Sequence, residues 1–284
     1  MGKAVVTNIR AKSIIVKSNL PGTDYVVNPY VGCVFGCSYC YASFIGRFND
    51  RSADDWGSYV LVKENAAELF AREIRRKCFN GANPPTLLFS SVTDPYQPVE
   101  KERGLTRRML EILAEYKFAG KISILTKSML AARDIDVFKR LRNIGVGITV
   151  NTVNKDVKRE FEPFTPDERS RLKALEELNA SGVNTYAFVG PIFPDCYDNH
   201  ALLSDTLKAI RDAGTKSVYL EHINLNPRIS ERLSCLLGKK ISKITMEQKK
   251  RIDDFAAEAC EHYGLAIIGG APIIHGEKNA PGNR

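Results

Sequence analysis

Three cysteines lie close together in the segment Cys33-Val34-Phe35-Gly36-Cys37-Ser38-Tyr39-Cys40. Soft thiolates at this spacing can bind three corners of a cube of iron and inorganic sulfide. Gly32 and Gly36 allow the backbone to turn tightly around such a bulky group. A ferredoxin would supply a fourth thiolate, but the remaining cysteines are scattered along the chain: Cys78, Cys196, Cys235 and Cys260. The pattern therefore predicts an iron–sulfur cluster in which one iron has no protein ligand.

Three other interpretations of these cysteines stay open. A zinc site takes four ligands, and the nearest histidine, His200, could join the cysteines only through folding. A cluster used only for electron transfer would leave the open iron unexplained. If the cysteines were only buried structural residues, the presence of Gly32 and Gly36 beside them would be unexplained.

Composition and length describe an ordinary globular chain. The 284 residues are 44% hydrophobic and 26% charged, which suits one α/β domain with a sizeable core. No apolar run reaches the roughly 18 residues that cross a bilayer, and the first twenty residues contain Lys3, Arg10, Lys12 and Lys17. We therefore expect no signal peptide, no membrane partner and a cytoplasmic location. An odd number of cysteines, seven, argues against a secreted disulfide framework.

Short apolar runs alternate with amphipathic stretches throughout the chain. The expected strands are residues 25–30, 86–90, 121–126, 145–151, 184–189 and 217–223. The expected helices are residues 64–78, 102–116, 135–143, 166–181, 202–213 and 246–263. For the helix at 166, Thr165 would cap, Pro166 would take the first turn and Glu168 would complete a capping box. Repeated strand–helix units predict a parallel sheet, open or curled into a barrel, with its ligand site at the carboxyl ends of the strands.

We expect one domain over residues 25–275, preceded by an extension at 1–24 and followed by a flexible tail at 276–284. The apolar residues 265–268, with the segment 271–274, are expected to pack across the barrel opening.

The segment from Asn28-Pro29-Tyr30-Val31-Gly32-Cys33 through Cys40-Tyr41-Ala42 resembles the radical S-adenosylmethionine (SAM) superfamily, in the branch of spore photoproduct lyase. The resemblance implies a partial (β/α)6 TIM-type barrel with a 4Fe-4S cluster on Cys33, Cys37 and Cys40. It further implies that SAM chelates the open iron and is cleaved reductively to a 5′-deoxyadenosyl radical, which abstracts hydrogen from a substrate. An external electron donor, flavodoxin- or ferredoxin-like, is implied as a partner.

The same resemblance suggests which residues bind SAM. Thr93 and Asp94 replace the usual Gly-Gly-Glu segment as acceptors for the methionine ammonium; the less favoured alternative is a polar turn built around Pro95. The other contacts are the Tyr39 carbonyl for adenine, Lys127 for the carboxylate or ribose, and Thr149 and Asn151 on one strand face. Lysine at a strand end is also compatible with simple solvation.

The hydrogen-transfer residues are less clear from the sequence. Ser91, grouped with the SAM-binding residues, stands where the lyase carries a hydrogen-donating cysteine, which puts thymine-dimer repair in doubt. Tyr41 matches a tyrosine of that enzyme's radical relay. Cys196 is an alternative donor or a structural cysteine.

Two further segments would complete the mouth of the barrel. The segment Gly190-Pro191-Ile192-Phe193-Pro194-Asp195-Cys196 would form an apolar wall that covers the adenine and excludes water. The polar run Glu221-His222-Ile223-Asn224-Leu225-Asn226-Pro227-Arg228 is a candidate for substrate contact, together with Tyr96, a catalytic candidate, and Gln97. Alternatively, Glu221 and His222 satisfy neighbouring backbone groups and charges.

The formal charge of +8 makes nucleic acid a candidate partner. The substrate is then a nucleic acid or nucleotide, or else a small metabolite or peptide. The competing hypothesis from another class is a non-catalytic zinc or iron–sulfur module that binds nucleic acid. The oligomeric state is not predicted.

Overall fold

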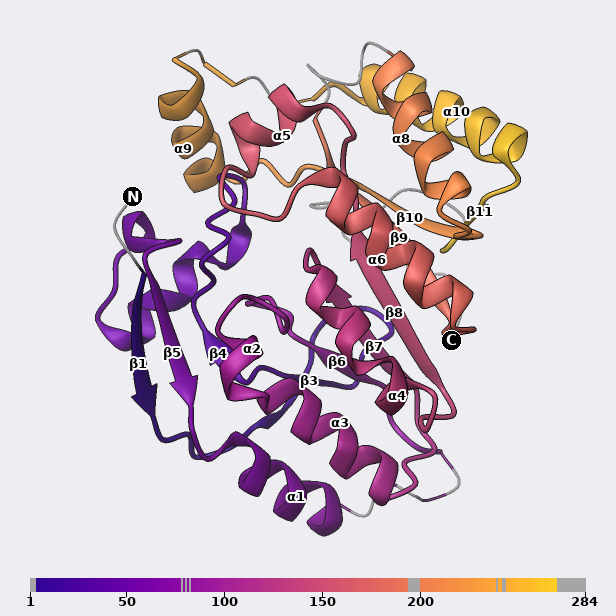
Figure 1. Ribbon diagram of the computed structural model, residues 1–284. Helices are drawn as coiled ribbons and strands as arrows, with labels where there is room; N and C mark the ends of the chain where they lie inside the picture. The colour runs from indigo at the N-terminus through magenta and orange to yellow at the C-terminus, as the bar shows by residue number, and fades with distance from the viewer. Residues whose placement is uncertain are drawn as a thin grey trace.

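The computed structural model describes residues 4–77, 79, 81, 83–193, 200–238, 240–241 and 244–269 (Figure 1). The main sheet has eight strands in the order β11-β10-β9-β8-β7-β6-β3-β2. Six of them form the parallel repeat: β3 (Tyr25–Val27), β6 (Leu87–Phe89), β7 (Ile122–Thr126), β8 (Ile144–Thr149), β9 (Thr185–Ile192) and β10 (Ser217–His222). All six predicted strands are thereby found in sequence order, although the first of them ends at Val27 instead of residue 30.

The sheet is open at both sides. At one side β2 (Ile15–Lys17) pairs with β3 in the antiparallel sense, and at the other β11 (Ala266–Ile267) pairs with β10 in parallel. This is the expected partial barrel. Residues 265–268 were expected to cross its opening, which is wrong for the described part of the segment. Ala266 and Ile267 instead pair in parallel with Ser217 and Val218 of β10 and so add one strand to the edge of the sheet.

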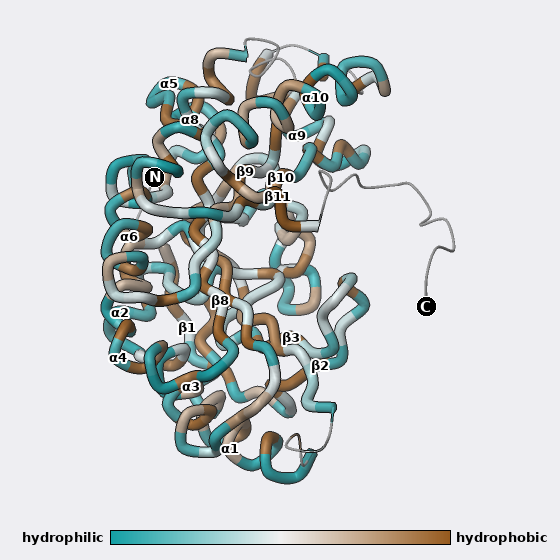
Figure 2. The backbone as a smooth tube through the Cα atoms, turned by 90° about the vertical axis from the view of Figure 1, so that its right-hand side faces the viewer, coloured by the Kyte–Doolittle hydropathy of each residue, from teal (hydrophilic) through white to brown (hydrophobic). Residues whose placement is uncertain are grey.

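Helices connect successive strands and cover the sheet from outside (Figure 1). The long ones are α1 (Ala66–Arg76), α3 (Leu105–Glu115), α6 (Glu168–Ala180), α8 (His200–Asp212), α9 (Pro227–Leu237) and α10 (Met246–Tyr263). Short ones are α2 (Glu100–Arg103), α4 (Ile135–Phe138) and α5 (Lys155–Phe161), and η1 (Tyr41–Asn49), η2 (Ala53–Asp55) and η3 (Met129–Asp134) are 3-10 turns. Burial of the apolar helix faces against the strands forms the core, and every residue of β8 is buried. The tube view shows hydrophobic colour along the strands and hydrophilic colour on the outer helices (Figure 2).

The first predicted strand, residues 25–30, is divided in two. β3 ends at Val27, and β4 (Tyr30–Val31) joins a different, three-stranded sheet in the order β1-β5-β4, with β1 (Val5–Ile9) and β5 (Tyr59–Lys63). Pro29 has no N–H for a ladder. The Asn28 side chain instead accepts hydrogen bonds from the backbone N–H groups of Ser91 (3.0 Å) and Val92 (3.3 Å). The cysteine segment therefore begins after β4, beside the main sheet.

The predicted start of the helix at 166 is also wrong. Asp167 is the N-cap of α6 and accepts from the Ser170 N–H at 2.7 Å. The Thr165 hydroxyl donates to the Glu162 carbonyl at 2.8 Å and is not available for the cap. The glycine stop is confirmed, with Gly182 at a φ of +76°.

None of the helices in the described ranges is both long and apolar enough to cross a membrane.

Candidate functional site

The cysteine loop is a largely buried turn that follows β4. Cys33 and Cys37 are each 7% exposed, Cys40 is half-buried, and all three are free thiols. Their backbone makes two tight turns, with Gly36 N–H donating to the Cys33 carbonyl (3.3 Å) and Cys40 N–H to the Cys37 carbonyl (3.1 Å). Gly36 has a φ of +54°, and a Cβ there would lie 3.1 Å from the Gly57 Cα. Glycine is thus required by conformation and by space.

Segments distant in sequence hold this loop in place. The Gln97 amide donates to the Gly32 carbonyl (3.2 Å) and accepts from the Val34 N–H (3.1 Å). The Thr93 hydroxyl donates to the same Gly32 carbonyl at 2.6 Å. On the other side, the Ser38 backbone N–H (3.0 Å) and hydroxyl (3.1 Å) both donate to the carbonyl of Phe161, at the end of α5. The loop therefore depends on the carboxyl end of β6 and on α5.

The environment keeps the metal-free thiols protonated. Burial raises the pKa of Cys33, and the neighbouring charges of Asp94, Cys37 and Cys40 raise it further. Burial raises the pKa of Cys37 to about 12, despite the opposing charge of Lys127. Burial likewise raises the pKa of Cys40. A thiolate is stable here only with a compensating cation such as a metal ion.

Within the described ranges, no three histidine, cysteine, aspartate or glutamate side chains converge on a position for one metal ion. A single zinc ion would require such convergence. A cubane cluster does not, because each thiolate binds a different iron.

Asp94 joins the carboxyl ends of two neighbouring strands. Its carboxylate accepts from the Thr126 hydroxyl (2.6 Å) and from the backbone N–H groups of Tyr96 and Lys127 (both 2.9 Å). Burial raises the pKa of Asp94, and these hydrogen bonds act in the opposite direction. The Asp94 carboxylate therefore fixes the backbone position of Lys127, the first residue after β7.

A buried ion network lies next to the loop. Glu162 and Arg171 form an ion pair in which both side chains are almost inaccessible, and Lys127 Nζ lies 3.7 Å from Glu162 Oε1. Burial raises the pKa of Glu162, but the charges of Arg171 and Lys127 outweigh it, and the pKa falls to about 2. Two cations against one carboxylate leave a net positive charge.

Tyr39 links this network to the aromatic wall. Its hydroxyl donates to Glu162 and accepts from the Asn151 amide at 3.3 Å. Its ring packs edge-on against Phe193, at 5.4 Å between centroids, and Phe193 stacks on Phe161 at 4.1 Å. Phe193, in the described part of the wall expected at residues 190–196, therefore lies beside Tyr39, while residues 194–196 lie outside the described residues.

Thr149 and Asn151 end β8 on the same side as Arg171. The guanidinium of Arg171 donates to the Thr149 carbonyl (3.2 Å) and to the Asn151 side-chain oxygen (3.4 Å). The predicted SAM-binding residues Tyr39, Lys127, Thr149 and Asn151 are thus brought together from three segments.

Tyr41 and Ser91 also meet. The Tyr41 hydroxyl donates to the Ser91 carbonyl, while the Tyr41 side chain remains 48% exposed.

Arg232 of α9 is half-buried, and its positive charge lowers the pKa of the Cys40 thiol against the larger effect of burial. One guanidinium nitrogen of Arg232, Nη1, is shielded from solvent and has no hydrogen-bond partner among the described residues.

Other candidates from the sequence have protein partners. Tyr96 is 0% exposed and its hydroxyl donates to Asp134 at 3.1 Å. The buried His222 imidazole lies 2.6 Å from a carboxylate oxygen of Asp253. Asn226 caps α9 by accepting from the Ile229 N–H at 3.1 Å. Cys196 lies outside the described residues.

Sequence reasoning missed Glu162 and Arg171. One signal was present, since Arg171 falls at helical spacing with Ala174, Leu175 and Leu178, all on the buried face of α6. An arginine on an apolar stripe indicates a buried acidic partner.

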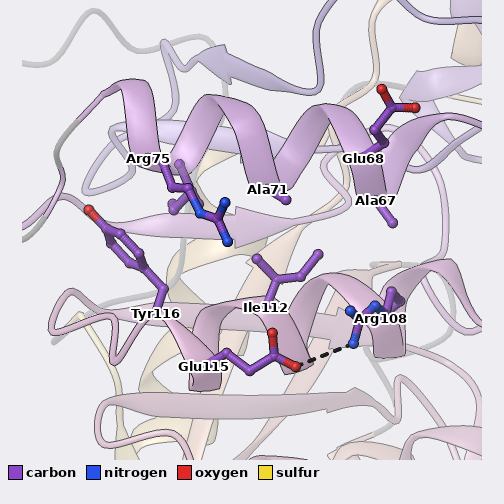
Figure 3. Close-up of a pocket in the computed structure, with 9 residues that line it drawn as sticks. Ala67, Glu68, Ala71, Arg75, Arg108, Ile112, Glu115 and Tyr116 are labelled. Carbon is purple, nitrogen blue, oxygen red and sulfur yellow. Dashed lines mark hydrogen bonds and ion pairs between the residues drawn. The ribbon is translucent and has the colours of Figure 1, made fainter.

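A separate depression of about 340 Å³ lies between α1 and α3 (Figure 3). Ala67, Ala71 and Ile112 line it together with charged side chains, including an Arg108–Glu115 ion pair at 3.3 Å. None of the residues described above contributes to its lining.

Comparisons with known proteins agree with this geometry. Residues 27–203 match the Radical SAM superfamily. An uncharacterised protein of Methanocaldococcus jannaschii is 38% identical over 78% of this chain and 79% of its own length. The Radical SAM Nalpha-GlyT isomerase of Pseudomonas phage M6 is 24% identical over 77% of this chain and 44% of its own length.

Among solved structures, spore photoproduct lyase complexed with dinucleoside spore photoproduct superposes with a TM-score of 0.72. It has 14% sequence identity and covers 92% of this chain and 81% of its own. That likeness concerns the fold. The family match covers more than half of the sequence, and the chain belongs to the radical SAM superfamily.

Proposed function

We propose that Cys33, Cys37 and Cys40 hold a 4Fe-4S cluster and that the adjoining strand ends bind SAM for reductive cleavage. The observation that carries this proposal is that one loop holds three free thiols, two buried and one half-buried, beside Tyr39, Lys127 and Asn151. When bound, the cluster supplies the electron that splits SAM, and the resulting 5′-deoxyadenosyl radical abstracts hydrogen from the substrate.

The residues present fit such a cluster. The thiols are close enough for their charges to affect one another. Gly32 directly precedes Cys33, and Gly36 directly precedes Cys37. A Cβ at Gly32 would lie 2.5 Å from the Tyr59 carbonyl oxygen. Glycine at these two positions lets the loop pack closely against Tyr59 and Gly57 while it carries its three thiols on one short turn.

SAM binding would fall to the groups beside the loop. The excess positive charge of the Lys127–Glu162–Arg171 network favours a carboxylate, with Lys127 as the direct partner. We assign Asn151 and Thr149 to the ribose and the Tyr39 carbonyl to the adenine, and Phe193 would exclude water. Thr93 and Asp94 are already engaged by Gly32, Thr126 and Lys127, so we assign them to shaping the site.

Hydrogen transfer would involve the half-exposed Tyr41, whose hydroxyl contacts the Ser91 backbone. Electrons would come from an external flavodoxin- or ferredoxin-like donor, as radical SAM enzymes generally require.

For the substrate we propose a nucleotide or nucleic acid. Arg232, whose positive charge acts on the Cys40 thiol, has a shielded guanidinium nitrogen that is suited to an anionic group such as a phosphate. The net charge of +8 favours the same class. The structural neighbour named above is complexed with a dinucleoside photoproduct, which is compatible with this choice.

Cluster assembly and SAM cleavage test the core of the proposal. After anaerobic reconstitution, we expect about four irons per chain, and dithionite with SAM should release 5′-deoxyadenosine. Ala substitution of Cys33, Cys37 or Cys40 should abolish both, whereas Cys235→Ala, at an exposed free cysteine, should retain both. Stoichiometric zinc without SAM cleavage would favour the non-catalytic module.

The substrate class needs a separate assay. Binding of a fluorescent single-stranded oligonucleotide should weaken steeply with salt and weaken further in Arg232→Met, while Arg232→Lys should retain part of it. Transfer of deuterium between deoxyadenosine and a peptide or metabolite, with no oligonucleotide binding at low salt, would contradict the nucleotide assignment.

A further inference from the structure

Trp56 is the one tryptophan of the chain, and it is buried against the cysteine loop. Its side chain is 2% exposed and belongs to a small apolar cluster with Cys33, Phe35, Cys37 and Ala42. The cluster is separate from the main core around the sheet.

The backbone around Trp56 is fixed against the same loop. η2 begins with a capping box between Ser52 and Asp55, and the Trp56 N–H donates to the Ala53 carbonyl at 3.2 Å. The Trp56 carbonyl oxygen would lie 3.7 Å from a Cβ on Gly36. The indole therefore has little freedom to turn away from the cysteines.

The indole nitrogen Nε1 has no hydrogen-bond partner among the described residues. Indole N–H is a donor and cannot accept, and leaving a buried donor unpaired is unfavourable. The cluster residues around the ring offer sulfur atoms and apolar groups. The missing acceptor is therefore best supplied by the group that the thiols bind.

We propose that the Trp56 indole N–H donates a hydrogen bond to a sulfur of the 4Fe-4S cluster and thereby raises its reduction potential. This rests on the cluster assignment above. Reduction adds negative charge to the cluster, so a donor to its sulfur stabilises the reduced form more than the oxidised form. Trp56 therefore acts on the reduction potential through the cluster sulfur and is not itself an iron ligand.

The test compares reconstituted wild type with Trp56→Phe and Tyr59→Phe. The Phe variant at 56 keeps an aromatic ring and loses the donor. Tyr59→Phe is the matched control, because the Tyr59 hydroxyl is also buried without a partner but lies outside the cysteine cluster. Iron content and circular dichroism establish that all three proteins are folded and loaded.

Redox titration should show the reduction equilibrium of Trp56→Phe shifted by about fivefold toward the oxidised cluster, from the typical strength of one hydrogen bond. For a one-electron couple this equals about 40 mV. Tyr59→Phe should match wild type. Equal potentials in all three loaded proteins would overturn the role of Trp56 and leave the cluster assignment intact.

A second measurement needs no variant. Because the chain has a single tryptophan, fluorescence excited at the red edge of the tryptophan band, where tyrosine does not absorb, reports on Trp56 alone, and cluster assembly on the adjacent thiols should quench it several-fold. Unchanged fluorescence in a fully loaded protein would also overturn the inference. Failure of the wild type to load iron would instead overturn the proposed function.

Discussion

Replacement of Arg171 by methionine would test whether the buried ion network stabilises the site. The change keeps much of the side-chain volume on α6 and removes the charge that pairs with Glu162. Lys127, at 3.7 Å, would be the remaining cation beside this carboxylate in the described structure. We expect a large loss of stability, because an ionised carboxylate is then buried with one weak ion pair.

The magnitude follows from the pKa of Glu162. The fall from 4.5 to about 2 corresponds to about 3 kcal/mol in favour of the ionised carboxylate in the folded chain. A lowered pKa contributes stability that is present above pH 4.5 and is lost as the pH falls toward 2. Most of that contribution should disappear at pH 7 in Arg171→Met, within the roughly 3–5 kcal/mol known for broken buried pairs.

Urea unfolding at pH 7 measures this loss directly. Arg169→Met is the matched control, since Arg169 lies on the exposed face of the same helix, and it should stay within about 0.5 kcal/mol of wild type. The double variant Arg171→Met, Glu162→Gln should be more stable than Arg171→Met, because the unpaired charge is gone. The deficit of Arg171→Met should also narrow as the pH is lowered to 4.5, where burial favours protonated Glu162.

Two outcomes would refute the reasoning. The network is not a source of stability if Arg171→Met unfolds at the same urea concentration as Arg169→Met. The account of a stranded carboxylate is wrong if the double variant is no more stable than Arg171→Met.

Three further predictions concern the loop and the mouth. Lys127→Gln should weaken SAM binding about tenfold or more by equilibrium dialysis, from the loss of a charge-assisted hydrogen bond; unchanged affinity would contradict the carboxylate assignment. Gly36→Ala should lower iron loading, because both space and φ are unfavourable, whereas Gly182→Ala, strained but with open space, should load normally. Tyr41→Phe should keep substrate-free SAM cleavage and lose substrate turnover; equal turnover would remove Tyr41 from the transfer step.

The strands were predictable because each is a short apolar run with a fixed place in a strand–helix repeat. The break after Val27 was not, since it depends on the Asn28 side chain bonding to Ser91 and Val92, far along the chain. The Thr165 cap failed for a different, local reason, because its hydroxyl donates to the carbonyl of Glu162 three residues earlier. A local signal is overridden wherever a polar side chain finds a competing partner, near or far.

The cluster ligands were predictable because three cysteines on one loop are a local pattern. The groups that hold the loop come from β6, β8, α5 and α6, and pairing between such segments leaves almost no local signal. Tyr39 shows the difference: its place between two thiols is visible in sequence, while the use of its hydroxyl by Glu162 and Asn151 is not.

The contacts of Ser38 and Tyr39 connect the cysteine loop with the residues proposed to bind SAM. Ser38 and Tyr39, between Cys37 and Cys40, are bound to Phe161 and Glu162, and Glu162 in turn pairs with Lys127. Displacement of the α5 end would therefore move the thiols and the proposed SAM cation together. Because Glu162 is held by Arg171 from α6, the position of both depends on one buried ion pair. Loss of that pair should thus weaken iron loading and SAM binding in parallel, which is why Arg171 is the most informative single position.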